Sequence, residues 1–215
     1  MGVPLANIRE HLASPTTESM RELLGDRRTA IAEERDRLNE QLREIDQLDH
    51  IFASVTTKEK NADMPHVVWL AERKAVFAPF PTDEMDPKLL HLTLMDAWGR
   101  LLETGTIPSR GFGALLDART ALTDNPLAGA GSMVILPREV PLADVEVVTL
   151  PAGEYVCMYK YSMPYDVTPL RKLLAWIEGR GLVPSGLVVD RCLLDSVFYN
   201  ESRKADFCRL EVLLG

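Results

Sequence analysis

Two segments near the C-terminus alternate in a way that could build a binding site. In both EYVCMYKY and DFCRLEVLL, every second residue is mostly aromatic or charged. In DFCRLEVLL, the residues between them are all apolar from the cysteine onward. Successive side chains of a strand point to opposite faces of a sheet. We therefore predict an aromatic-lined site with a few polar anchors on one face, and helices packed on the other. The predicted site residues are Tyr155, Tyr159, Tyr161, Phe207, Arg209 and Glu211.

Simpler explanations are open for each of these residues. Aromatic residues suit half-exposed strands whether or not a ligand binds. Arg209 and Glu211 could pair with neighbours across the sheet and do nothing else. Trp69, in the first strand-like segment, could add a ring to the site or belong to the core.

Metal and nucleophile chemistry find little support in the sequence. Cys157, Cys192 and Cys208 are widely spaced, and strand alternation places Cys208 on the helix side, so we expect three reduced thiols in the core. The four histidines lie in different segments without ligand spacing. No phosphate-binding loop, dinucleotide-binding glycine pattern or nucleophile elbow occurs. We therefore predict no metal site, no cofactor and no catalytic residue.

Composition restricts the classes of function. The 215 residues are 46% hydrophobic and 26% charged, which is ordinary for a globular protein. No segment has the apolar length of a membrane span or the pattern of a signal peptide, so we expect a cytoplasmic protein with no membrane partner. The net charge of −8 argues against nucleic acid as a direct partner, because phosphate-binding surfaces are usually basic.

The segment 17–52 predicts a long helix with one narrow apolar seam. Apolar residues recur every seven positions, and almost all the others are charged or polar. A helix of this kind cannot bury its seam alone, and the seven-residue spacing is typical of a coiled coil. We therefore predict a homodimer through this helix; the alternative is a helix lying on its own domain. The predicted dimer contacts are Leu24, Ile31, Leu38, Ile45 and Phe52.

Residues 66–215 predict an α+β domain made of two similar halves. An Asp-Pro pair at Asp86 and a Thr-Pro pair at Thr168 favour helix starts. Strand-like segments surround each helix in the order strand, helix, strand, strand, and ETGTIPSRGFGALLD resembles EGRGLVPSGLVVD in the second half. The duplication predicts an antiparallel sheet with both helices on one face, which leaves the other face for a site.

Several stretches resemble a known family. GVPLANIREHL followed by MRELLGDRRTAIAEERDRLNEQLREIDQLDHI is similar to the end of the DNA-binding head and the long dimerisation helix of a MerR-type transcription regulator. LPAGEYVCMYKYSMPYD, LLAWIEGRGLVPSG and FCRLEVLL are similar to the GyrI-like effector-binding domain of multidrug-sensing members. The resemblance implies a remnant of a winged helix-turn-helix at 1–15, a dimerisation helix at 16–54, a linker at 55–65 and the effector-binding domain at 66–215.

The resemblance also implies that most of a DNA-binding head is missing. A full-length regulator of this type carries a winged helix-turn-helix before GVPLANIREHL. We therefore expect a truncation, an internal start or a natural start further upstream. DNA is then a partner only of a form that carries the head.

The resemblance further implies a groove for lipophilic compounds, cationic ones among them, lined by aromatic residues and a glutamate of the last strand. Glu211 best matches that glutamate. Arg209 could also be aligned there, which leaves the preference for cations open. If Arg209 neutralises Glu211, the pocket would suit neutral or anionic ligands instead. Tyr165 in SMPYD matches a turn of the family, although Ser-Met replaces the glycine of that turn.

We therefore predict the effector-sensing and dimerisation half of a MerR-type transcription regulator, not an enzyme. One alternative is a stand-alone protein that binds or sequesters small molecules. The other is a GyrI-like hydrolase of strained electrophilic compounds, with Glu211 and Tyr155 or Tyr159 as the acid/base pair.

Overall fold

The structure, a computed structural model, divides the chain into two compact units, Met1–Arg43 and Glu44–Gly215. The segment 1–15, predicted as a remnant of a DNA-binding head, lies outside the described residues. Among the residues that are described, no helix combines the length and the apolar character needed to cross a membrane. The described residues are 16–82, 86–106, 110–137, 140, 146–195 and 206–215.

Helix α2 (Thr17–Glu59) confirms the predicted long helix. Each of the five seam residues is about half exposed in the single chain, between 43% at Phe52 and 52% at Ile31 and Ile45. The helix ends five residues beyond the predicted boundary at residue 54, and Val55 in this extension is buried with Tyr159 and Phe207 of the same unit. Dimerisation through the seam stays a prediction.

Eight strands form one sheet in the order β1-β6-β8-β7-β3-β4-β2-β5. Every pair of neighbouring strands is antiparallel. The element order after α2 repeats a strand pair, a helix and two strands, which confirms the predicted duplication. The strands are β1 (His66–Leu70), β2 (Arg73–Pro79), β3 (Phe112–Asp117), β4 (Gly131–Ile135), β5 (Glu146–Leu150), β6 (Gly153–Tyr161), β7 (Pro184–Leu194) and β8 (Phe207–Leu214).

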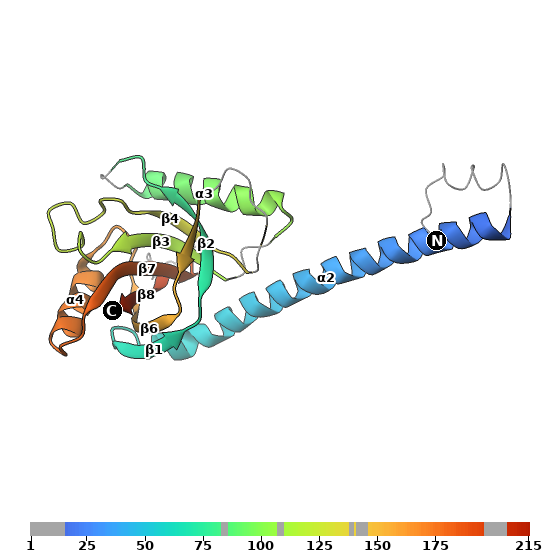
Figure 1. Ribbon diagram of the computed structural model, residues 1–215. Helices are drawn as coiled ribbons and strands as arrows, with labels where there is room; N and C mark the ends of the chain where they lie inside the picture. The colour runs from blue at the N-terminus through green and yellow to red at the C-terminus, as the bar shows by residue number, and fades with distance from the viewer. Residues whose placement is uncertain (1–15, 83–85, 107–109, 138–139, 141–145, 196–205) are drawn as a thin grey trace. The chain divides into compact units, whose positions relative to one another are not determined.

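The short connections require the sheet to curl (Figure 1). Strand β1 is first in the sheet order and β2 is seventh, yet only two residues separate Leu70 from Arg73. Three peptide units span at most about 11 Å, whereas six strand spacings in a flat sheet would cover about 29 Å. The β5–β6 connection makes the same demand between Leu150 and Gly153. One face of the sheet is therefore turned inward.

Helices α3 (Pro87–Glu103) and α4 (Thr168–Glu178) pack on the other face. Asp86 caps α3 as predicted, because its carboxylate accepts a hydrogen bond from the backbone N–H of Leu89 at 2.6 Å. Helix α4 buries Leu170, Leu173, Leu174 and Ile177 against β6, β7 and β8. The predicted α+β fold, an antiparallel sheet with both helices on one face, is confirmed.

Candidate ligand-binding site

Strand alternation places the predicted site residues on the face turned inward, which we call the charged face. Leu210 and Val212 of β8 pack with α4, so their neighbours Arg209 and Glu211 point to the opposite face. Across the β6–β8 ladder, Arg209 pairs with Tyr159 and Glu211 pairs with Cys157. The charged face is defined here by Arg73, Tyr155, Tyr159, Arg191, Arg209 and Glu211.

Three arginines surround the fully buried carboxylate of Glu211. Arg73 Nη1 lies 2.7 Å from Oε2, and Arg209 donates from Nε to Oε1 at 2.8 Å and also from Nη2. Arg191 Nε lies 3.6 Å from Oε1, which is an ion pair but too long for a hydrogen bond. The guanidinium groups come from β2, β7 and β8, which the curl of the sheet brings together.

The arginines determine the ionisation of Glu211. Burial by itself would raise the pKa of this carboxyl, but the positive charges of Arg209, Arg191 and Arg73 lower it to about 2. Burial and the neighbouring Arg209 lower the pKa of Arg191 to about 10. At neutral pH the cluster therefore contains one negative and three positive charges.

Several donors of the cluster have no acceptor among the described residues. The buried Nε and Nη2 atoms of Arg73 and the buried Nε atom of Arg191 make no hydrogen bond. A buried donor without a partner costs on the order of 1–3 kcal/mol. The neighbouring side chains on this face are apolar and buried, among them Ala75, Leu150 and Val189. The arrangement suits a ligand that has an acidic group on an apolar body.

Lys58, in the last turn of α2, adds a further positive charge beside the cluster. Burial is the main cause that lowers its pKa to about 8, and the charges of Arg191 and Arg209 lower it further. Its ammonium group donates to the hydroxyl of Ser54. A ligand with negative charge would counter the repulsion and raise this pKa again.

Aromatic rings extend the site toward the end of α2. The Tyr159 and Phe207 rings stack with centroids 5.7 Å apart, and the His66 ring stacks with Tyr159 at the same centroid distance, 5.7 Å. Tyr161 lies 4.9 Å from Phe207, and its hydroxyl bonds to the carboxylate of Glu59. Three of the predicted aromatic residues therefore form one cluster.

Tyr155 lies apart from these rings and beside Arg73. It is fully buried, and the Arg73 guanidinium lies 5.5 Å from its ring centroid. Its hydroxyl donates to the carbonyl oxygen of Pro151 at 2.7 Å. Tyr155 thus places an aromatic ring against the positive charge of Arg73.

Two predicted site residues do not join the charged face. Trp69 pairs with Glu154 across β1 and β6, in the alternation phase opposite to Tyr155, and is 67% exposed. Tyr165 packs with the helix-side core around α4. The face of Trp69 depends on the register between β1 and β6, and the position of Tyr165 depends on the turn after β6.

Sequence reasoning missed Arg73, Arg191 and Lys58. Arg191 was within reach, because it shares the phase of Val189 in the segment GLVVDRCLL. Arg73 was missed because HVVWLAERKAVFAPF was predicted to be a single strand, whereas the structure has two strands there, the second of which begins at Arg73. Lys58 was assigned to the linker.

The geometry does not favour acid/base chemistry at Glu211. A carboxylate whose pKa is lowered to about 2 holds a proton too weakly to act as a good general base near neutral pH. Burial raises the pKa of the Tyr155 hydroxyl and raises that of the Cys157 thiol to about 12, so neither group ionises readily. These atoms are better suited to holding a ligand than to activating water.

Cavities also lie elsewhere among the described residues of the domain. One, of about 510 Å³, lies between α3 and strands β2 and β5, with Phe77, Leu92 and Ala97 among its lining residues. Another, of about 270 Å³, is bordered by His91 of α3 and by Cys192 and Cys208. The charged face differs from both because its arginines concentrate positive charge.

Comparison with solved structures supports the fold assignment. The C-terminal domain of EcmrR aligns with 71% of this chain and 97% of its own, at a TM-score of 0.54 and 10% identity. The sheet domain of this chain therefore shares the fold of the EcmrR C-terminal domain. EcmrR in a complex with DNA aligns with 99% of this chain and 78% of its own, at a TM-score of 0.52 and 9% identity. A hydrolase from Listeria innocua aligns at a TM-score of 0.46 and 11% identity over 75% of this chain and 98% of its own. In sequence, the chain matches no protein-family model and no curated protein.

Proposed function

We propose that residues 66–215 are the ligand-sensing domain of a MerR-type transcription regulator, and that the ligand is an aromatic compound with an acidic group. The shared fold with the EcmrR C-terminal domain supports the first part. The observation that carries the second part is the charge of the site. Glu211 meets three arginines, and donors of Arg73 and Arg191 have no acceptor among the described residues.

A lipophilic cation, which the family resemblance implies, fits this site poorly. It would enter a face where three guanidinium groups outnumber the one carboxylate described above, and Lys58 adds to the repulsion. A carboxylate would instead accept hydrogen bonds from buried arginine donors. Bonds of this kind contribute about 1.5–3 kcal/mol each, because one partner is charged.

The seam of α2 is the surface through which we propose that two copies of this chain associate. Its apolar residues recur every seven positions and are about half exposed in the single chain. Ligand binding would act on the dimer only if the two arrangements of the subunits differ in their affinity for the ligand. Val55, near the end of this helix, packs with Tyr159 and Phe207 beside the proposed site, so the helix has a physical contact through which such a difference could arise.

A set of matched naphthalene compounds tests the charge preference. We would titrate the protein calorimetrically with derivatives of equal size that carry a carboxylate, a carboxamide or a trimethylammonium group. The carboxylate should bind tightest and the ammonium weakest. Arg73→Gln should weaken carboxylate binding by about 10- to 100-fold, the equivalent of one charged hydrogen bond, and should leave the carboxamide almost unchanged.

Arg119→Gln is the matched control, because Arg119 is an exposed arginine paired with Asp117 and distant from the charged face in the register of the sheet. It should bind all three compounds as the wild type does. Tighter binding of the ammonium compound, or an Arg73→Gln protein that keeps its preference for the carboxylate, would refute the proposed ligand class.

A further inference from the structure

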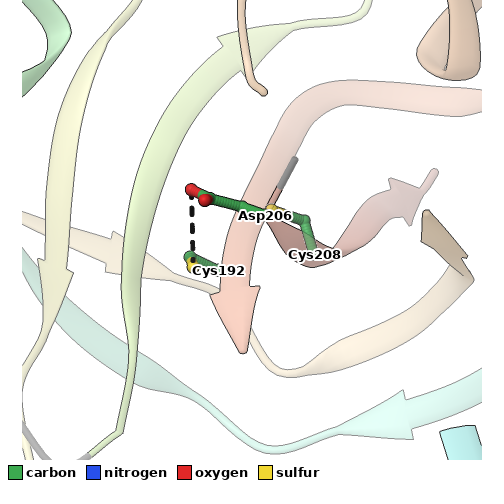
Figure 2. Close-up of side chains that lie close together, drawn as sticks. All are labelled: Cys192, Asp206 and Cys208. Carbon is green, nitrogen blue, oxygen red and sulfur yellow. Dashed lines mark hydrogen bonds between the residues drawn. The ribbon is translucent and has the colours of Figure 1, made fainter. Parts of the chain in front are cut away.

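Two of the three cysteines meet on the helix face of the sheet together with a carboxylate. Cys192 of β7 and Cys208 of β8 are direct partners across the antiparallel ladder, and Asp206 immediately precedes β8. Figure 2 shows the three side chains converging, with the Cys192 thiol hydrogen-bonded to Asp206 Oδ2 at 3.8 Å. All three residues are buried.

The distances among these groups are close to those of a metal site. One ligand atom from each residue lies within 4.8 Å of the other two. Ligands at about 2.0–2.3 Å from a tetrahedral zinc ion lie about 3.3–3.8 Å apart, so side-chain shifts of about 1 Å would be enough. Two thiols and a carboxylate are also a chemical set that zinc accepts, whereas magnesium and calcium prefer oxygen ligands alone.

The surroundings bear on both the charge and the coordination number of such an ion. Zinc with two thiolates and one carboxylate has a net charge of −1. Lys160, which pairs with Cys208 across the β6–β8 ladder, already forms an ion pair with the buried carboxylate of Asp190 at 2.7 Å, so it does not balance this extra negative charge. All three residues border the cavity of about 270 Å³, which His91 also lines. The cavity gives space for a fourth ligand, either water or a side chain that borders it.

We propose that Cys192, Asp206 and Cys208 form a binding site for a thiophilic divalent cation of the zinc type, separate from the charged face. The ion would link the end of β7 to the start of β8. The site is independent of the ligand proposed above, because the two lie on opposite faces of the sheet. Cys157, which pairs with Glu211 across the β6–β8 ladder, lies on the charged face, whereas Cys208 lies on the helix face. The proposal assigns a metal-binding role to two of the three thiols that the sequence analysis expected only in the core.

Cobalt substitution in the reduced, metal-free 215-residue protein tests this site. Cobalt(II) should bind with a stoichiometry of one per chain and produce the charge-transfer absorption of a thiolate-bound metal, which zinc should then abolish by displacement. Cys192→Ser and Cys208→Ser should each reduce this absorption and weaken binding. Asp206→Asn should weaken binding at least by the ~10- to 100-fold that loss of an outer-shell partner costs. Cys157→Ser is the matched control and should behave as the wild type does.

X-ray absorption spectroscopy of the zinc-loaded wild type keeps the test decisive even if the serine variants fail to fold. We expect two sulfur ligands at about 2.3 Å and lighter ligands at about 2.0 Å. Absence of a thiolate band, a zinc environment without sulfur, loss of binding in Cys157→Ser, or a fully reduced protein that takes up no metal would each overturn the proposal.

Discussion

Removal of the charge of Glu211 should destabilise the domain strongly and in a way that depends on pH. Glu211→Gln keeps the size of the side chain but leaves Arg73, Arg191 and Arg209 without the carboxylate they share. The shift of the Glu211 pKa from 4.5 to about 2 corresponds to about 3 kcal/mol of native-state stability at pH 7. Loss of one partner of a buried ion pair commonly costs about 3–5 kcal/mol, which agrees with that value.

The sign of the pH dependence follows from the lowered pKa. The contribution of Glu211 is fully present above pH 4.5, because the carboxyl is then ionised in both states, and it is lost as the pH falls toward 2. About 2 kcal/mol of it should be gone by pH 3. Urea unfolding of wild type and Glu211→Gln at pH 7 and pH 3 measures the difference, which should shrink at the lower pH.

Glu154→Gln is the control, because Glu154 is exposed and lies in the opposite phase of the same sheet. It should change the free energy of unfolding by only a few tenths of a kcal/mol. If Glu211→Gln is as stable as the wild type, or if its deficit is equal at both pH values, the reasoning about the arginine cluster is wrong.

Three further predictions concern other parts of the chain. Lys160→Met should destabilise the domain by about 3–5 kcal/mol in urea unfolding. The reason is that the buried carboxylate of Asp190, which lies 2.7 Å from the Lys160 ammonium group, loses its partner. If the double variant Lys160→Met/Asp190→Leu recovers none of this stability, the prediction is wrong. Leu38→Asp should convert a dimer into monomers with a folded sheet domain, because an unpaired charge in an apolar seam costs several kcal/mol. Light scattering and circular dichroism measure the two properties. A wild type that is monomeric at tens of micromolar would show that the seam is not a dimer contact. Affinity for the naphthalene carboxylate should fall as the pH rises from 7 to 9, because Lys58 with its pKa of about 8 loses its charge. In Lys58→Met, the affinity measured by calorimetry should depend less on pH. An equally steep pH dependence in that variant would exclude Lys58 as the cause.

Alternation along β6 and β8 predicted which face the residues of these two strands occupy. It placed Arg209 and Glu211 opposite the apolar residues of β8, and it placed Cys208 on the helix side. Alternation contains no information on which strands become neighbours. The meeting of Arg73 with Glu211 depends on the curl of the sheet, which brings β2 near β8 although their residues are far apart in sequence.

The same limit explains the cysteine pair. Cys192 and Cys208 meet because β7 and β8 are in a register that makes them direct partners. A shift of one residue would have sent one thiol to the opposite face. The sequence shows the two phases, but the register follows from packing of the whole sheet against α3 and α4.

The most direct test of the central claim is a crystal structure of the protein with the naphthalene carboxylate bound. We predict that its carboxylate oxygens lie within hydrogen-bond distance of the guanidinium nitrogens of Arg73 or Arg191, with the rings against the apolar residues of the charged face. A ligand bound in the cavity beside α3, or any position in which the carboxylate contacts none of the three arginines, would contradict the account.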